Sequence, residues 1–231
     1  MQTSVINFIL YVCNIPPVIA SLFALLYFKK VGRRLYSFNL FLICNGIIQI
    51  TQLVILKFSK SYHLLMFHID VPVEFILLAH FYYSFLKSYL DKKVYFIIVA
   101  IFTTFSILNS IFIQPVNSFN SYALVGESTL LIILSVFSFI VLLDTRSGMK
   151  STTIGKIFEL INSGIFVYYS ASLFIYYFSN HYILHQKNND TTSFISITVS
   201  YIFILNTFLA ACMFTCFIIA LRKHIKSNGA Y

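Results

Sequence analysis

The sequence predicts an all-α, polytopic membrane protein that folds as a bundle of seven transmembrane helices. Three observations predict this class. Hydrophobic residues make up 59% of the 231 residues and charged residues only 10%, whereas soluble domains carry about 25% charged residues. The apolar residues form seven long stretches, each longer than the roughly 20 residues that a helix needs to cross the hydrocarbon core. Basic residues follow every second stretch. We therefore expect a single transmembrane domain over residues 1–231.

The apolar runs, and the charged or turn-forming residues between them, define the seven elements. We expect helices near residues 3–28, 35–57, 64–87, 93–114, 121–144, 155–182 and 193–221. The first run has no preceding Lys or Arg and is longer than the apolar part of a signal peptide, which favours a retained helix. Pro115 ends the fourth run at a turn. The runs are continuously apolar, which argues against a β-barrel.

The chain has a net charge of +9, and its basic residues are divided unevenly between the two sides of the membrane. Thirteen of the sixteen basic residues follow the first, third, fifth or seventh stretch: Lys29, Lys30, Arg33, Arg34, Lys87, Lys92, Lys93, Arg146, Lys150, Lys156, Arg222, Lys223 and Lys226. Only Lys57, Lys60 and Lys187 fall on the other side. The positive-inside rule then places the N-terminus outside and the C-terminus in the cytoplasm of an inner or plasma membrane. Because topology explains the charge, we expect lipid headgroups and no nucleic acid as partners.

The third stretch carries two acids, Asp70 and Glu74, on either side of Pro72. Their spacing of four residues places both carboxylates on one helical face. Two acids so close together in a medium of low dielectric constant should not both ionise freely. The pair is therefore the strongest candidate for a proton, cation or ligand site, and the alternative is a buried polar network that fixes helix packing. His68 lies about 160° from Asp70 around an ideal helix, which argues against a metal site on this helix alone.

Polar residues from five stretches fall in the half of the membrane remote from the basic loops. They are Gln49, Gln52, His68, Asp70, Asn109, Gln114, Asn120, Tyr122, Glu127, Tyr168, Tyr169, Ser170 and Ser172. Glu74 and Asn45 lie nearer the middle of the membrane. This gathering predicts a pocket that faces outward. The alternative is that each polar group pairs with its neighbour and holds two helices together.

The seven-span plan matches rhodopsins and G-protein-coupled receptors in topology only. A retinal protein needs a lysine within the last helix, and residues 193–221 contain none. The receptor motif Asp-Arg-Tyr is absent after the third stretch. Seven-span zinc hydrolases need several His ligands, and the last stretch has no His before His224. We therefore expect no metal, no cofactor and no catalytic residue of a known set, although an intramembrane acid-dyad enzyme stays open.

Two segments carry a resemblance to a family. They are Phe119-Asn120-Ser121-Tyr122-Ala123 followed by Glu127, and Ile161-Asn162-Ser163-Gly164-Ile165 followed by Tyr168 and Ser170-Ala171-Ser172-Leu173-Phe174. They resemble motifs of small, uncharacterised seven-transmembrane proteins of Bacteroidetes-type bacteria, with His68 and Glu74 at the positions of that family's polar residues in the third helix. Those proteins look like stand-alone versions of the membrane sensor modules of histidine kinases. The resemblance implies a sensing role and implies no particular ligand.

These observations favour a receptor-like membrane sensory module that binds a small molecule or lipid. We expect His68, Asp70, Glu74 and Glu127 to form the polar floor of its pocket, and Asn109, Asn120, Asn162 and Tyr168 to supply hydrogen bonds. A cytoplasmic or membrane signalling partner, such as a histidine kinase, would receive the output. The alternatives are a proton- or cation-coupled small-solute transporter, in which Asp70 and Glu74 titrate, and an intramembrane lipid-modifying enzyme.

Overall fold

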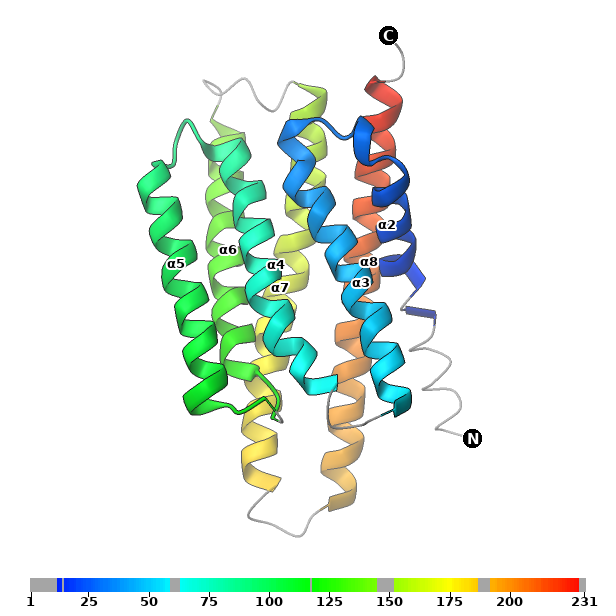
Figure 1. The fold of residues 1–231 in the computed structure, drawn as a ribbon, viewed down its shortest axis with the longest axis vertical. Helices are drawn as coiled ribbons and strands as arrows, with labels where there is room; N and C mark the ends of the chain where they lie inside the picture. Colours follow the sequence, from blue (N-terminus) through cyan, green and yellow to red (C-terminus); the bar gives the residue numbers. More distant parts are fainter. Residues whose placement is uncertain are drawn as a thin grey trace.

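The computed structural model is an all-α bundle (Figure 1). It describes residues 12–13, 15–58, 63–116, 118–144, 152–186 and 192–228, with side chains described at 12–13, 15–51, 54–55, 64–116, 118–144, 152–178 and 204–227. These residues contain seven α-helices: α2 (Ile15–Leu26), α3 (Tyr36–Phe58), α4 (His63–Leu86), α5 (Lys92–Leu108), α6 (Ser121–Leu143), α7 (Thr153–Gln186) and α8 (Thr192–Asn228). Two 3-10 helices, η1 (Phe28–Lys30) and η2 (Arg33–Leu35), join α2 to α3, and a π-helix, η3 (Asn109–Ile113), extends α5.

Five helices in the described part of the chain are long and apolar enough to cross a membrane. They are Leu64–Leu86, Lys92–Ile113, Ser121–Leu143, Thr153–Phe178 and Ile204–Ser227. α2 is apolar but shorter, with 12 residues. The outer face of α5 and η3 exposes large apolar side chains, and Phe112 is 76% exposed. A continuous apolar face of this kind is suited to lipid, where helices satisfy their own backbone polar groups. The chain is therefore a membrane protein.

The helices lie close to their predicted positions wherever the structure describes them. The first predicted helix, 3–28, falls partly outside the described residues. α2 begins at Ile15, so Pro16 and Pro17 occupy its first turn, where a missing N–H costs little. α8 continues past the predicted end at residue 221 as far as Asn228. The basic residues from Arg222 onward therefore lie on the last helix and not on a tail behind it.

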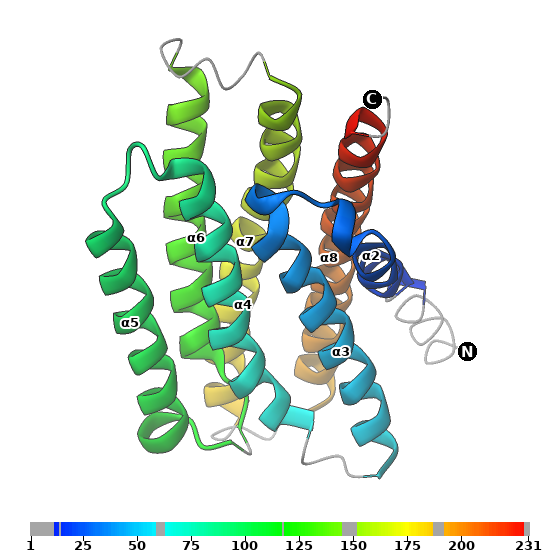
Figure 2. The same cartoon turned by 45° about the horizontal axis from the view of Figure 1, so that its top comes forward.

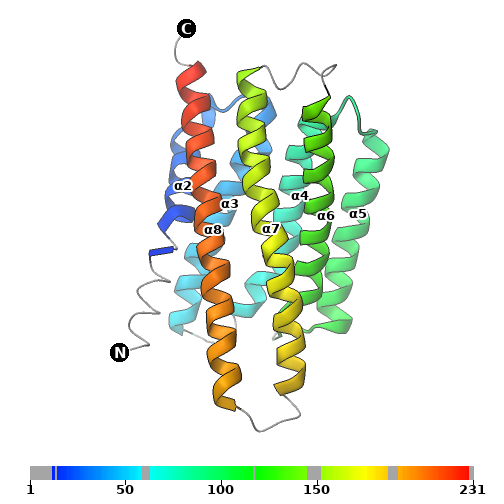
Figure 3. The same ribbon diagram turned by 180° about the vertical axis from the view of Figure 1, so that it is seen from behind.

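The connections that carry basic residues gather at one end of the bundle. The link from α2 to α3, the link from α4 to α5, the start of α7 and the end of α8 all lie at the top of Figure 1, and the view from behind in Figure 3 agrees. Every Lys and Arg side chain that the structure describes belongs to these segments. The bundle thus has a basic end, defined by these four segments, and an opposite end without a described basic side chain.

Phenylalanine rings fill the core next to the basic end. The rings of Phe85 and Phe158 stack with centroids 4.1 Å apart, which joins α4 to α7. Phe38 of α3 lies 5.2 Å from Phe81 of α4 and meets Phe217 of α8 edge-on at 4.9 Å. Such offset and edge-on pairs add stabilisation beyond the apolar area that they bury. This aromatic packing closes one half of the bundle.

α2 packs against α3 and α8, and it extends from the basic end to the level of the middle of the bundle (Figure 2). Its close approach to α3 depends on Gly46, where an added Cβ would lie 2.1 Å from the Ser21 Oγ. The Asn39 side chain also donates a hydrogen bond of 3.0 Å to the carbonyl oxygen of Ala24. Small residues let membrane helices approach in this way, and side-chain hydrogen bonds then hold them together.

Candidate functional site

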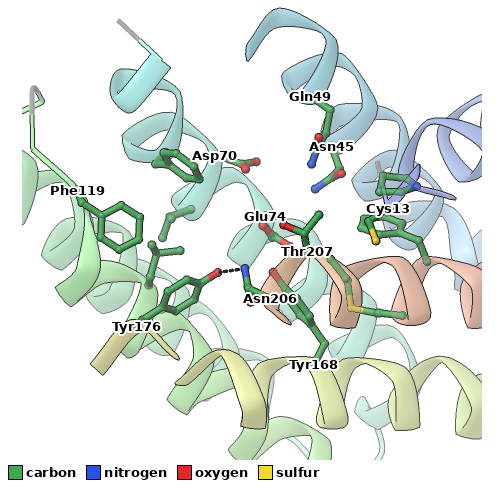
Figure 4. Close-up of a pocket in the computed structure, with 17 residues that line it drawn as sticks. Cys13, Asn45, Gln49, Asp70, Glu74, Phe119, Tyr168, Tyr176, Asn206 and Thr207 are labelled. Atoms are coloured by element: carbon green, nitrogen blue, oxygen red, sulfur yellow. Dashed lines mark hydrogen bonds between the residues drawn. The ribbon is translucent and has the colours of Figure 1, made fainter. Parts of the chain in front are cut away.

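A cavity of about 270 Å³ lies between α2, α3, α4, α7 and α8, in the half of the bundle beyond the aromatic packing. Its lining includes side chains from these five helices, Leu124 of α6 and Phe119 of the connection before α6 (Figure 4). The polar members of this lining, hereafter the polar pocket, are Cys13, Asn45, Gln49, Asp70, Glu74, Tyr168, Tyr176, Asn206 and Thr207. The volume is just below the range of typical small-molecule sites, about 300–1,000 Å³.

The two acids of α4 both line the polar pocket. Asp70 and Glu74 are one helical turn apart, and Pro72 between them is a helix-interior proline. Tyr169 of α7 donates a hydrogen bond of 2.5 Å to Glu74 Oε1, which fixes that carboxyl group from behind. The described lining contains no Lys, Arg or His. The pocket therefore holds two acids without a basic side chain among its described lining residues.

Amide side chains approach the acids from two other helices. Asn45 and Gln49 of α3 are also one turn apart and lie on the pocket side of that helix (Figure 4). On α8, Asn206 accepts a hydrogen bond of 2.8 Å from the Ser172 hydroxyl and donates one of 3.5 Å to the Tyr176 hydroxyl. These hydrogen bonds join α7 to α8 on one side of the pocket.

Three of the eight sequence-predicted site residues line the polar pocket: Asp70, Glu74 and Tyr168. The other five are buried, and they lie outside its lining. His68 faces the α5–α6 side, where its two ring nitrogens are 2.8 Å from the Ser110 hydroxyl and 3.1 Å from the Ser118 carbonyl oxygen. This direction follows from its position on α4, nearly opposite to Asp70.

Asn109 and Asn120 stabilise the connection between η3 and α6. The Asn109 amide donates hydrogen bonds to Asn120 Oδ1 (2.8 Å) and Gln114 Oε1 (3.1 Å). Gln114 in turn donates to the Ser121 hydroxyl (2.8 Å) and accepts from the backbone N–H of Tyr122 (3.0 Å). These hydrogen bonds hold the helix end together and satisfy the Tyr122 backbone N–H, whereas Asn109 Oδ1 and Asn120 Nδ2 find no hydrogen-bond partner among the described residues.

Asn162 belongs to a separate network in the half of the bundle next to the basic end. Its Oδ1 accepts hydrogen bonds of 2.8 Å from both the Tyr82 and the Ser135 hydroxyls, and its Nδ2 donates to the Ser135 carbonyl oxygen (3.1 Å). The side chain is fully buried. It joins α4, α6 and α7, and this matches the packing alternative for a polar residue in a membrane helix.

Glu127 of α6 lies behind the pocket. It is 1% exposed, and its Oε1 has no hydrogen-bond partner in the described part of the chain. It is close enough to Asp70 and Glu74 to interact with them electrostatically. Three acids therefore share one low-dielectric region, although only two of them line the cavity.

Sequence reasoning missed four polar members of the pocket: Cys13, Tyr176, Asn206 and Thr207. Asn206 was recoverable, because an Asn in the middle of a long apolar run is rare and usually faces the interior of a bundle. The other three residue types are common in membrane helices and carry no such signal.

The described residues contain no group of three or more His, Cys, Asp or Glu side chains that could hold a metal ion. What the pocket offers is a set of carboxylate, amide and hydroxyl oxygens beside aromatic rings. No family model, curated protein or solved structure matches this chain.

Proposed function

We propose that this chain is a receptor-like sensory module of an inner or plasma membrane, and that it binds a small molecule in the polar pocket. In this proposal the chain crosses the membrane seven times, with its N-terminus outside and its C-terminus in the cytoplasm. The position of all described basic side chains at one end supports that orientation. The pocket then faces outward, because its lining belongs to the opposite half of the bundle.

The observation that carries the proposal is the cavity of about 270 Å³ between α2, α3, α4, α7 and α8. Well-packed interiors contain few voids larger than a water molecule. A space of this size, lined by acids and amides in the middle of a membrane protein, is costly unless something occupies it. Occupancy would change the packing of five helices at once, and it would favour one arrangement of their cytoplasmic ends. A histidine kinase or another signalling partner at the basic end would read this change.

Ligand binding is tested by thermal unfolding of the purified chain against a library of small metabolites. A metabolite that binds the folded chain raises the unfolding midpoint. The variant Ala210→Phe fills the pocket and should abolish that rise, since Ala210 lines the cavity. The matched control is Ala100→Phe, on the exposed face of α5, which should leave the rise intact. A rise that survives Ala210→Phe would exclude this cavity as the binding site.

A second candidate function, a proton- or cation-coupled small-solute transporter, is favoured by Glu127. A receptor needs no third acid behind its pocket, whereas a relay of protons or cations needs several. Counterflow in proteoliposomes distinguishes the two functions. A transporter loses counterflow on Glu74→Gln and Glu127→Gln, whereas a receptor shows none and still binds its ligand after Glu127→Gln. In the same proteoliposomes, lipid turnover that depends on Glu74 would favour the third alternative, an intramembrane lipid-modifying enzyme.

A further inference from the structure

We propose that the polar pocket selects small organic cations, namely protonated amines, and holds the ammonium group between Asp70, Glu74 and the Asn45 side-chain oxygen. This inference rests on the proposed function, because it names the chemical class of the ligand. Three features of the pocket carry it: its uncompensated acids, an unpaired amide oxygen, and the aromatic rings around them.

The first feature is charge. Asp70 and Glu74 line the cavity, and the described lining residues include no Lys, Arg or His. The Tyr169 hydroxyl gives Glu74 one neutral hydrogen bond and no compensating charge. The nearby Glu127 is a further acid. Isolated carboxylates are costly in a membrane interior, and a bound cation removes that cost. An anionic ligand would add to the repulsion.

The second feature is Asn45. Its side chain is 9% exposed, it lines the same cavity, and its Oδ1 has no hydrogen-bond partner among the residues that the structure describes. Figure 4 shows Asn45 between Gln49 and Glu74, on the side of α3 that faces the acids. A buried amide oxygen that accepts nothing is uncommon in folded proteins. Carboxylates and this oxygen all accept hydrogen bonds, and an ammonium group supplies three donors.

The third feature is the rest of the lining. The aromatic rings are those of Phe67, Phe119, Tyr168, Tyr176 and Phe214. Ring faces attract cations and also pack against the carbon skeleton of an organic ligand. The cavity has room for about nine waters at ~30 Å³ each. This exceeds what a bare ion fills, and the described residues offer no set of three metal ligands. Size, rings and oxygens together favour an organic amine.

Cys13 provides a reporter inside the pocket, because it is a free cysteine in the lining. The full chain is prepared with the other three cysteines replaced by alanine, namely Cys44, Cys212 and Cys216. Two thiol reagents of similar size are compared, 2-aminoethyl methanethiosulfonate, a cation, and 2-sulfonatoethyl methanethiosulfonate, an anion. Each rate at Cys13 is divided by the rate with free cysteine, which removes the intrinsic reactivity of the reagent.

The inference predicts a normalised rate for the cation at least about tenfold above that for the anion, as expected for a cleft with one sign of charge. Asp70→Asn and Glu74→Gln should each lower this ratio by about threefold or more. The matched control is Glu159→Gln, the same chemical change on α7 at a residue outside the lining, and it should leave the ratio unchanged. If an acid variant does not fold, the ratio in the unmodified acid background still decides the question.

Each outcome addresses a different proposal. If Cys13 reacts with neither reagent, small molecules do not reach the pocket and the proposed function itself fails. If Cys13 reacts without preference for the cation, the pocket is accessible but the inference about ligand class is overturned.

Ligand protection gives a second readout. Three probes share a phenyl ring and differ in charge: 2-phenylethylamine, 2-phenylethanol and 3-phenylpropanoate. Of the three probes, only 2-phenylethylamine should slow Cys13 modification and raise the unfolding midpoint. Equal protection by the alcohol would overturn the cation preference and leave small-molecule binding intact.

Discussion

The contact between α2 and α3 yields a prediction whose size follows from the geometry. An added Cβ at Gly46 would lie 2.1 Å from Ser21 Oγ and 2.3 Å from Ser21 Cβ. The Oγ can rotate away, but the Cβ is fixed to the backbone of α2. To reach a contact of ~3.5 Å, α2 must move by about 1.2 Å. Gly46→Ala should therefore cost about 1–3 kcal/mol of unfolding free energy, as overpacking usually does.

That cost corresponds to a fall of roughly 2–12 °C in the unfolding midpoint for a chain of this length. The measurement is thermal unfolding in detergent micelles. Ser21→Gly removes the opposing side chain and should restore most of the stability in the double variant. Gly32→Ala is the matched control, because a Cβ there meets nothing within 4 Å. A Gly46→Ala variant as stable as the parent, or one that Ser21→Gly does not rescue, would refute the proposed close approach.

Four further substitutions test the buried polar groups. Tyr82→Phe removes one hydrogen bond to Asn162 and should lower the free energy of unfolding by about 0.6 kcal/mol. Asn162→Leu leaves the Tyr82 and Ser135 hydroxyls without that acceptor and should lower it by about 1–3 kcal/mol. Both changes are measured by thermal unfolding. Glu127→Leu should be neutral or stabilising, because its Oε1 has no hydrogen-bond partner within the described ranges, and a lower midpoint would contradict this. His68→Ala should speed hydrogen exchange in the connection between η3 and α6 without changing ligand binding, because His68 contacts Ser110 and Ser118 there. Unchanged exchange would show that His68 does not stabilise this connection.

The helices were predictable because a membrane imposes a simple constraint. Apolar runs long enough to cross the hydrocarbon core must be helical, and basic residues mark one set of their ends. The end of α8 was harder to predict. The last helix was predicted to end near residue 221, before Arg222, Lys223 and Lys226, yet long basic side chains can extend from a helix toward the headgroups while the helix continues.

The site was predictable only in part, because sequence fixes the depth of a residue better than its direction. Asp70 and Glu74 stood out as a pair of membrane acids, and their spacing gave them a common face. Asn109 and Asn162 are equally polar, but their side chains form hydrogen bonds with neighbouring segments and do not line the pocket. Only the packing of the helices α4, α5, α6 and α7 determines where these side chains point. Asn206, an amide within a long apolar run, signals a position inside the bundle, but only the packing of α8 against α7 shows that it faces the pocket.

The most direct test of the polar pocket is an experimental density map of the chain purified from membranes and incubated with 2-phenylethylamine. The expected result is non-protein density against Asp70 and Glu74, within hydrogen-bond distance of Asn45 Oδ1. Protein side chains filling that space, or a basic side chain paired with Glu74, would contradict the existence of a ligand site between these helices.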